Sequence, residues 1–265
     1  MNILEKNMAD ILADLKENYG ALSVKAEFET EGTSFEEAAR LKELSTDSDL
    51  KFTVKIGGCE AMRDINDAKF LCADEIVAPM IETPYALKKF VRAINNIYPD
   101  NEKTKIKLFI DVETITGYSN FKDIISSDEF SDVSGIVFGR SDMAASMDLT
   151  TEQTDSDIMF NMACNMSEKM RSAKKDFIVG GNITPKTSEF LAKIPYCTKF
   201  ETRKIIFDNK NNTDINTSDG IIKAINFEIM WMQNRRENYG IKLQDDEQRI
   251  NILKYRCYNT KTAEL

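Results

Sequence analysis

Two hydrophobic periods alternate along this chain. Short apolar runs, such as Ile136-Val137-Phe138, are followed by longer stretches in which apolar residues recur every three or four positions. Short buried runs predict strands and the longer period predicts amphipathic helices, so the alternation indicates a parallel sheet covered by helices. The expected strands lie at residues 21–28, 52–56, 75–80, 107–113, 135–139, 177–179 and 197–207.

The length of the chain favours a closed barrel over an open sheet. With 265 residues it is about as long as one (β/α)8 barrel. We therefore expect an α/β fold of the TIM-barrel type, as a single domain over residues 1–265. Its barrel core should lie at 20–207 and extra C-terminal helices at 217–257. Because only seven strands can be assigned, we expect the barrel to be irregular or short of one strand at the N-terminus.

Two of the expected strands run directly into carboxylates. Glu113 follows the run Leu108-Phe109-Ile110-Asp111-Val112, and Asp142 follows the strand at 135–139. About one strand-helix repeat separates them, so the two strands should be parallel neighbours whose carboxyl ends lie side by side. Two converging carboxylates bind a hard cation or share a proton, because left alone they repel each other.

Charged residues also occupy the inward-facing positions of four expected strands. In a barrel strand alternate residues point into the interior, and here those positions alternate with apolar ones. The charged positions are Lys25, Glu27, Glu29, Lys55, Asp111, Glu113, Lys199, Glu201 and Arg203. Buried ions must pair, bind a ligand or lie at the open end of the barrel. A structural ion-pair network and an active site at the strand carboxyl ends are both compatible with this pattern.

Composition narrows the chemistry. The net charge of −9 and the isoelectric point of about 4.9 argue against nucleic-acid and membrane partners. The chain contains no histidine, which excludes Ser-His-Asp and Cys-His nucleophile systems, histidine-ligated zinc and a histidine base. Its five cysteines form no CxxC pair and are typical of reduced thiols, so we expect a cytoplasmic protein.

Four segments together resemble the metal-dependent hydroxy-ketoacid aldolase/citrate lyase β-chain family. The similarity extends over residues 20–205 in the same order and at similar spacing. The segments are 54–61, 75–82, 110–114 and 138–144, of which the Val112-Glu113-Thr114 and Phe138-Gly139-Arg140-Ser141-Asp142 strand ends carry most weight. The resemblance implies a (β/α)8 barrel that binds Mg²⁺ or another divalent ion, such as Mn²⁺ or Co²⁺, and a substrate that forms an enolate.

The same resemblance implies roles for individual residues. Glu113 and Asp142 match the metal ligands, and Lys55 stands where the family has an arginine that holds the substrate carboxylate. Lysine keeps the charge of arginine but loses its bidentate fork. The residues around the second strand end are expected to bind the same carboxylate through backbone amides: Gly139, Arg140, Ser141 and Asp142. The Arg140 side chain is either a second anion contact or a solvated loop residue.

The catalytic base departs from the family pattern. An early Asp-x-x-His pair matches Glu27-Phe28-Glu29-Thr30 here, with Thr30 in the place of the histidine. Glu27, Glu29 or a metal-bound water must then move the proton. Because burial raises carboxyl pKa values, Glu27 is the first candidate for a base that titrates near neutral pH. The citrate and malyl-CoA lyase branch of the family also does without that histidine.

We therefore expect a divalent-metal-dependent carbon–carbon lyase or aldolase that acts on a 2-oxo acid or related carboxylate. One alternative is a phosphoenolpyruvate-using transferase or mutase on the same site. The other is a non-catalytic barrel that binds an acid or a partner protein. The substrate should be a small carboxylate, namely a 2-oxo acid, phosphoenolpyruvate or an acyl-CoA. Trp231 on a long apolar helix suggests an oligomer interface, so we expect a homo-oligomer.

Overall fold

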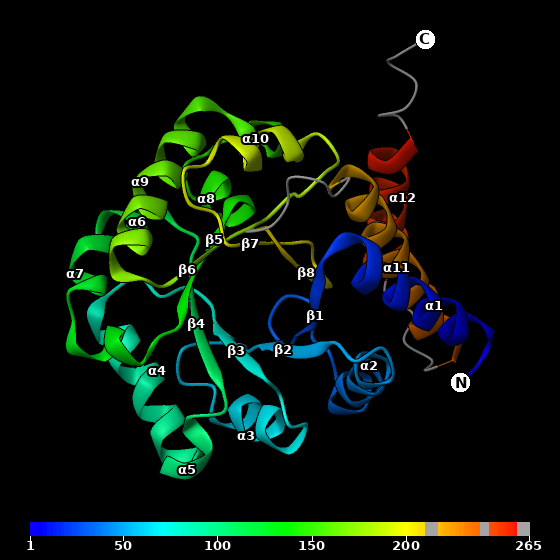
Figure 1. Ribbon diagram of the computed structural model, residues 1–265, viewed down its shortest axis with the longest axis horizontal. Helices are drawn as coiled ribbons and strands as arrows, with labels where there is room; N and C mark the ends of the chain where they lie inside the picture. The colour runs from blue at the N-terminus through cyan, green and yellow to red at the C-terminus, as the bar shows by residue number, and fades with distance from the viewer. Residues whose placement is uncertain (210–216, 239–243, 259–265) are drawn as a thin grey trace.

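Eight strands close into one barrel in the computed structural model, which describes residues 1–209, 217–238 and 244–258 (Figure 1). The strands follow one another around the barrel in the order of the sequence. They are β1 (Ala21–Glu27), β2 (Lys51–Lys55), β3 (Glu75–Ala78), β4 (Lys107–Val112), β5 (Gly135–Gly139), β6 (Asp176–Gly180), β7 (Lys199–Glu201) and β8 (Ile205–Asp208). The predicted TIM-type barrel is therefore confirmed.

The eighth strand is the last one in the sequence, and its direction is antiparallel to that of its two neighbours. β1 to β7 pair in parallel, whereas β8 is antiparallel to both β7 and β1. The predicted single strand at 197–207 is in fact β7, a tight turn and β8. The barrel is irregular, as one of the two expectations had it, but it does not lack a strand at the N-terminus. Instead, a hairpin takes the place of the last strand-helix unit.

The hairpin turn is held by hydrogen bonds rather than by a glycine. The Thr202 backbone N–H donates to the Ile205 carbonyl at 2.9 Å, and the Ile205 N–H donates to Thr202 Oγ1 at 3.1 Å. Phe200 and Phe207 face each other across the hairpin with their rings stacked 4.7 Å apart. No Asn-Gly or Gly pair marks the turn, and the charged and apolar alternation of residues 199–203 extends into it before it breaks at Arg203-Lys204.

The helices surround the barrel much as the hydrophobic period predicts. Thr83 caps α4 by accepting a hydrogen bond from the Ala86 backbone N–H at 3.1 Å, and Pro84 occupies the first turn. The helices are α1 (Ile3–Tyr19), α2 (Phe35–Asp47), α3 (Met62–Phe70), α4 (Pro84–Ile97), α5 (Asp100–Lys103), α6 (Ile115–Ser119), α7 (Phe121–Ile125), α8 (Arg140–Ser146), α9 (Asp157–Ala173), α10 (Thr187–Lys193), α11 (Thr217–Asn238) and α12 (Gln244–Tyr258), with 3₁₀ turns η1 (Asp128–Asp132) and η2 (Thr151–Asp155).

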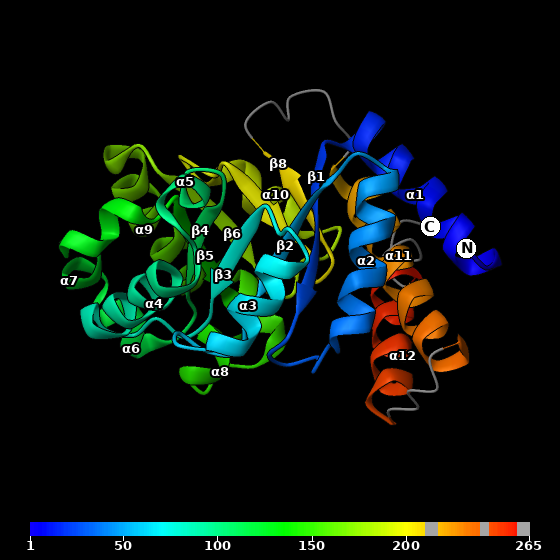
Figure 2. The same ribbon diagram turned by 90° about the horizontal axis from the view of Figure 1, so that it is seen from below.

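The N-terminal and C-terminal helices pack together on one flank of the barrel. Figures 1 and 2 place α1, α11 and α12 beside β1 and α2. Asn2 donates to Asn234 at 2.7 Å, and Arg235 Nε donates to Glu37 Oε1 at 2.6 Å, which joins α11 to the start of the chain. Within the predicted C-terminal segment, residues 239–243 lie outside the described residues.

Trp231 is a core residue of this flank. Its side chain is fully buried within the chain, so its burial needs no partner copy. The inference of an oligomer interface from Trp231 is therefore wrong, because neighbouring helices of the same chain already cover this side of α11. No described helix is both long enough and apolar enough to cross a lipid bilayer.

The barrel interior is layered along its axis. At the amino end, Lys199 Nζ lies 3.4 Å from Glu75 Oε1 and 3.5 Å from Asp176 Oδ2, all three on first residues of strands. Four apolar side chains form the middle layer: Val77, Phe109, Val137 and Ile178. Charged side chains fill the carboxyl end. The predicted inward charge is confirmed, and the apolar layer separates the two charged ends of the barrel.

Candidate active site

A small cavity opens at the carboxyl ends of the strands. Its volume is about 120 Å³, and its walls come from β1, β2, β4, β5, β6 and the β7–β8 hairpin, with α11 and α12 over one side. The predicted metal ligands, Glu113 and Asp142, both line it. The expectation that these two strand ends face one site is therefore confirmed. Lys55, Gly139 and Ser141 line the same cavity.

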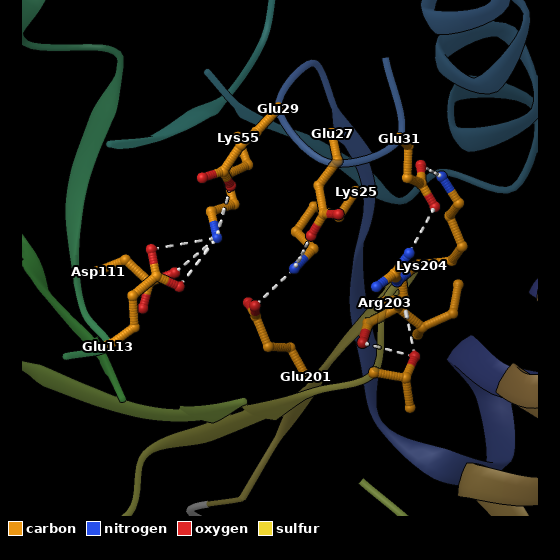
Figure 3. A network of polar contacts seen from close by, with 12 residues as sticks. Lys25, Glu27, Glu29, Glu31, Lys55, Asp111, Glu113, Glu201, Arg203 and Lys204 are labelled. Carbon is orange, nitrogen blue, oxygen red and sulfur yellow. Dashed lines mark hydrogen bonds and ion pairs between the residues drawn. The ribbon is translucent and has the colours of Figure 1, made fainter. Parts of the chain in front are cut away.

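Lys55 is the centre of a carboxylate cluster on one side of the cavity (Figure 3). Its Nζ lies 2.9 Å from Glu29 Oε2, 3.0 Å from Asp111 Oδ2 and 3.1 Å from Glu113 Oε2. Burial alone would lower the pKa of Lys55, but Asp111 and Glu113 raise it well above its usual range. The lysine is thus a fixed cation that three acids share, and its ammonium group faces protein carboxylates in this structure.

Lys25 holds a second pair of acids beside the first cluster. Its Nζ lies 2.6 Å from Glu201 Oε1 and 3.2 Å from Glu27 Oε1 (Figure 3). Burial tends to raise the pKa of Glu27, but Lys25 and Arg203 outweigh it and hold that pKa well below the usual range. The expected rise in the Glu27 pKa is therefore wrong. Glu27 stays ionised at neutral pH and is a poor acceptor for a proton.

Glu113 is buried in surplus negative charge. One oxygen, Oε1, accepts a hydrogen bond from the Met80 backbone N–H at 3.0 Å, and the other faces Lys55. Burial raises the pKa of Glu113 well above its usual range, and the neighbouring Asp111 raises it further although Lys55 opposes the shift. Asp142 adds to the same repulsion. The Glu113 carboxyl group therefore holds its proton in water but can release it when a metal cation binds in its place.

The first turn of α8 borders the cavity opposite these acids. Ser141 and Asp142 are exposed there, directly after the end of β5. The Arg140 side chain turns away and is fully buried. Its guanidinium donates to the carbonyls of Gly180 at 3.1 Å and Gly181 at 2.7 Å, and it pairs with Asp155. Both expectations for the Arg140 side chain, that it contacts an anion or that it is solvated, are therefore wrong. Only the backbone of Arg140 remains for a ligand to contact.

Glycines at the strand ends make room for these groups. A Cβ on Gly139 would lie 2.7 Å from Glu113 Cβ and 3.0 Å from Asp111 Oδ1. A Cβ on Gly181 would lie 2.4 Å from the Ser141 backbone nitrogen and 2.7 Å from that of Arg140. Real Cβ atoms do not approach so closely. The absence of side chains at both positions therefore keeps the carboxylates and the α8 amides accessible.

Comparison with known families decides the identity of the barrel. The family model described as HpcH/HpaI aldolase/citrate lyase matches residues 39–180, which is more than half of the chain. The chain belongs to this family. The matched segment contains Lys55, Glu113 and Asp142, whereas β1, the β7–β8 hairpin and α12 lie outside it. No curated protein matches the chain in sequence.

Solved structures of HpcH/HpaI proteins share the fold. An HpcH/HpaI aldolase from Desulfitobacterium hafniense DCB-2 has a TM-score of 0.59 at 10% identity, covering 76% of this chain and 83% of its own. A family protein from Burkholderia cenocepacia J2315 has a TM-score of 0.58 at 13% identity, covering 74% and 83%. The citrate synthase SbnG has a TM-score of 0.57 at 15% identity, covering 74% and 81%. Identities this low show the barrel alone.

The donors at this HpcH/HpaI site fit a hard divalent ion. No three acidic, cysteine or histidine side chains of the described residues form a complete metal site on their own. Mg²⁺ commonly takes only one or two protein carboxylates and completes its shell with water and substrate oxygens. Asp111 Oδ1, beside Glu113, is buried and accepts no hydrogen bond from a nitrogen or hydroxyl donor of the described residues. Besides burial, a side-chain hydrogen bond to Asp111 raises the pKa of Glu113, so the two acids share a proton at a place where a cation could bind instead.

Three arginines of this family member escaped the sequence analysis as site residues. The sequence pattern predicts only that Arg203 occupies an inward-facing strand position, and it predicts no role for Arg249 or Arg256. All three line the cavity. Their signal in the sequence is weak: Arg249 and Arg256 are two helical turns apart on α12, which places them on one face. Nothing local shows that this face turns towards the barrel.

Proposed function

We propose that this protein is a divalent-metal-dependent carbon–carbon lyase or aldolase that acts on a small 2-oxo acid. The observation that carries the proposal is the surplus of buried negative charge around Glu113, in a cavity that also contains Asp142 and the first turn of α8. Family membership supports the class of reaction, and the remaining arguments come from the residues of this chain.

Glu113 and Asp142 are the proposed metal ligands, with the carboxylate of Asp111 beside Glu113. Bound Mg²⁺, Mn²⁺ or Co²⁺ would supply electrophilic stabilisation of the negative charge that develops on the 2-oxo acid. The Met80 N–H fixes one oxygen of Glu113, so the carboxylate keeps its orientation without the ion. Lys55 offsets part of the repulsion among the acids and keeps the protein folded before the metal binds.

The substrate carboxylate is proposed to bind at the first turn of α8. The backbone N–H groups of a first helical turn have no partners within the helix, and those of Arg140 and Ser141 lie beside the open face of Gly181. The proposed role of the Arg140 side chain is to hold this turn in position through Gly180 and Gly181. Lys55 provides the positive charge within the carboxylate cluster that lines the same cavity as the amides of α8.

Glu29 is the proposed proton carrier. Glu27 is excluded because Lys25 and Arg203 keep its pKa far below neutral. Glu29 is half-buried at the edge of the same cluster, and its carboxylate contacts Lys55 at 2.9 Å. Glu29 is not among the residues that line the cavity, so a bound water would have to carry the proton between Glu29 and the substrate.

The size of the cavity supports a small acid rather than an acyl-CoA. A space of about 120 Å³ holds several water molecules. That is the scale of a three- or four-carbon acid, and it leaves no room for a pantetheine arm inside the barrel. An acyl-CoA substrate would have to leave almost all of its coenzyme outside the cavity.

Glu113→Gln and Asp142→Asn test the metal site. We expect each variant to lose Mg²⁺ or Mn²⁺ binding in a calorimetric titration while staying folded, because removing one acid relieves repulsion instead of leaving a cavity. Glu168→Gln, at a half-buried acid on α9 that pairs with Arg171, is the control and should bind metal normally. Unchanged affinity in both site variants would show that the ion binds elsewhere.

Ligand response then separates the alternatives. With metal present, wild-type protein should be stabilised by pyruvate or oxaloacetate in a thermal-shift measurement. A response confined to phosphoenolpyruvate favours a transferase or mutase on the same site. No response to any of these acids or to acyl-CoAs favours a non-catalytic barrel that binds a different acid or a partner protein.

A further inference from the structure

The outer part of the cavity is lined by arginines. Arg203 comes from the turn between β7 and β8, and Arg249 and Arg256 come from α12. The carboxylate cluster around Lys55 lies at the strand ends, deeper in the barrel, whereas the arginines stand at the hairpin and the covering helix. The cavity is therefore acidic at its inner end and basic at its outer end.

Packing turns the basic face of α12 towards the cavity. Leu253 lies between the two arginines of α12 in sequence and on the same helical face, and it is almost fully buried. Arg249 Nε donates to Glu228 Oε1 of α11 at 3.2 Å, which fixes the orientation of that face. The arginines are thus held against the barrel rather than extended into solvent.

The three guanidinium groups are close enough to repel one another. Burial lowers the pKa of Arg256, and the charges of Arg249 and Arg203 lower it further, while Glu228 opposes the shift. Burial would lower the pKa of Arg203, but Glu27 and Glu31 raise it, with Arg203 Nη1 4.0 Å from Glu31 Oε1 (Figure 3). Like charges held together at a cavity wall are stabilised when an anion binds between them.

We infer that Arg203, Arg249 and Arg256 bind a second anionic group of the substrate, a carboxylate or a phosphate at the end away from its 2-oxo acid. This inference rests on the proposed function and narrows its substrate to dianionic acids. One end of such a molecule meets the α8 turn and the metal ligands, and the other end meets the arginines. All three arginines lie outside the segment that matches the family model, so the inference rests on the geometry of this chain alone.

The arginines also stand on a route out of the cavity. Arg256 and Asn182 line both this cavity and a wider neighbouring groove, which is bordered by Ile252 and Tyr255 of α12. An anionic group at Arg256 therefore lies where the inner cavity meets the surface. A substrate longer than four carbons can therefore reach towards that groove and place its second anionic group at Arg256.

Three acids that differ only at one end test the inference. Pyruvate, oxaloacetate and phosphonopyruvate share the 2-oxo acid, and their third carbon carries a hydrogen, a carboxylate or a phosphonate. We expect metal-loaded wild-type protein to bind one or both dianions at least about tenfold more tightly than pyruvate in calorimetric titrations. Which dianion binds more tightly shows whether the arginines prefer a carboxylate or a phosphate.

Arg203→Gln, Arg249→Gln and Arg256→Gln should each remove about tenfold or more of the affinity for the preferred dianion. Their affinity for pyruvate should stay within about twofold of wild type. Arg171→Gln, at an exposed arginine near the end of α9, is the matched control and should change neither. Equal losses for pyruvate and the dianions, or no loss for any acid, would overturn the inference.

A titration with malonate and inorganic phosphate, without metal, separates this inference from the proposed function. If wild-type protein binds no 2-oxo acid, the proposed function fails. The arginines must then still bind one of these two simple anions, and Arg256→Gln must weaken that binding while Arg171→Gln does not. If neither anion binds, the arginine site itself is refuted.

Discussion

At the residue scale, Lys55 is the group on which the charge of the site depends. A single ammonium group lies within about 3 Å of three carboxylates, at 2.9, 3.0 and 3.1 Å. The three protons of an ammonium group can serve all three acids at once. Arginine, the residue that the family resemblance implies here, would need a planar arrangement of acceptors instead. The change from arginine to lysine thus suits a compact cluster of acids.

Lys55→Met should destabilise the metal-free protein. We expect a loss of about 3–5 kcal/mol in the free energy of unfolding, because buried acids would remain without their counter-ion. Mg²⁺ affinity should rise, since the ion then meets no competing positive charge. Chemical denaturation with and without Mg²⁺ measures both effects.

Lys204→Met is the control for this experiment. Lys204 is also fully buried and pairs with Glu31, away from the metal ligands. It should destabilise the protein without changing Mg²⁺ affinity. Weaker Mg²⁺ binding in Lys55→Met than in Lys204→Met would contradict the proposed role of Lys55.

Strand parity and strand ends were enough to predict where the acids of the site lie. Glu113 and Asp142 follow neighbouring strands, and both line the cavity. Sequence alone did not show the direction of the Glu27 pKa shift, because besides Lys25 on the same strand it depends on Arg203, which the fold brings close from the hairpin. The fate of Arg140 was equally hidden, since its partners are backbone carbonyls on β6 and beyond.

At the element scale, the contact between the end of β6 and the start of α8 decides whether a carboxylate can bind. Gly181 has a left-handed backbone with φ of 77° and lies directly against the first amides of α8. A side chain there would occupy the space that the proposed substrate carboxylate needs. The contact depends on a strand and a helix that are neighbours in the barrel but separate in sequence.

Gly181→Ala should therefore abolish 2-oxo acid binding, because its Cβ would displace the first amides of α8. Mg²⁺ binding should weaken less, since Asp142 shares the displaced turn whereas Glu113 lies on another strand end. Gly32→Ala is the matched control. It has a similar left-handed φ of 54°, but a Cβ there meets nothing within 4 Å. Calorimetry with pyruvate compares the two variants. Normal pyruvate affinity in a folded Gly181→Ala protein would place the carboxylate elsewhere.

Helix and strand positions followed well from hydrophobic periodicity, except where a turn lacked its usual residues. The strand at 135–139 agrees with the sequence pattern. The β7–β8 hairpin does not, because the alternation of residues 199–203 runs into the turn and only the break at Arg203-Lys204 marks it. Its turn is stabilised by side-chain and backbone bonds of Thr202, which no short-range rule distinguishes from strand pairing.

On the scale of the whole molecule, charge is arranged along the barrel axis. A small ion-pair group closes the amino end, an apolar layer separates it from the rest, and acids crowd the carboxyl end below the arginines. The apolar layer isolates the upper acids from the lower lysine, so Lys199 cannot offset their repulsion. Lys25 and Lys55 offset part of that repulsion, and proton uptake or cation binding at the upper acids offsets more of it.

The metal-free protein should lose stability as pH rises from about 6 to about 9. The pKa of Glu113 is raised in the folded protein, so its stabilising contribution is complete below the ordinary carboxyl pKa and is lost as pH approaches the raised value. Glu201, whose pKa burial also raises, adds to the same trend. Thermal unfolding across this pH range measures the slope.

Two comparisons identify the group responsible. Glu113→Gln should flatten the slope, because its side chain has no proton to lose. Saturating Mg²⁺ should flatten it in wild-type protein, and Mg²⁺ affinity should rise with pH as the competing proton leaves. An unchanged slope in Glu113→Gln would assign the titration to another group.

Closure of the barrel by an antiparallel last strand also affects how the protein is made. Val24 of β1 pairs with Ile205 of β8, so one of the first strands to leave the ribosome must wait for the last. Until then the hydrogen-bonding edge of β1 is open to other chains. An inward-pointing charge on a strand discourages such pairing, and Lys25 lies in the middle of β1. The lysine that later steadies Glu27 and Glu201 can therefore also protect the nascent chain from aggregation.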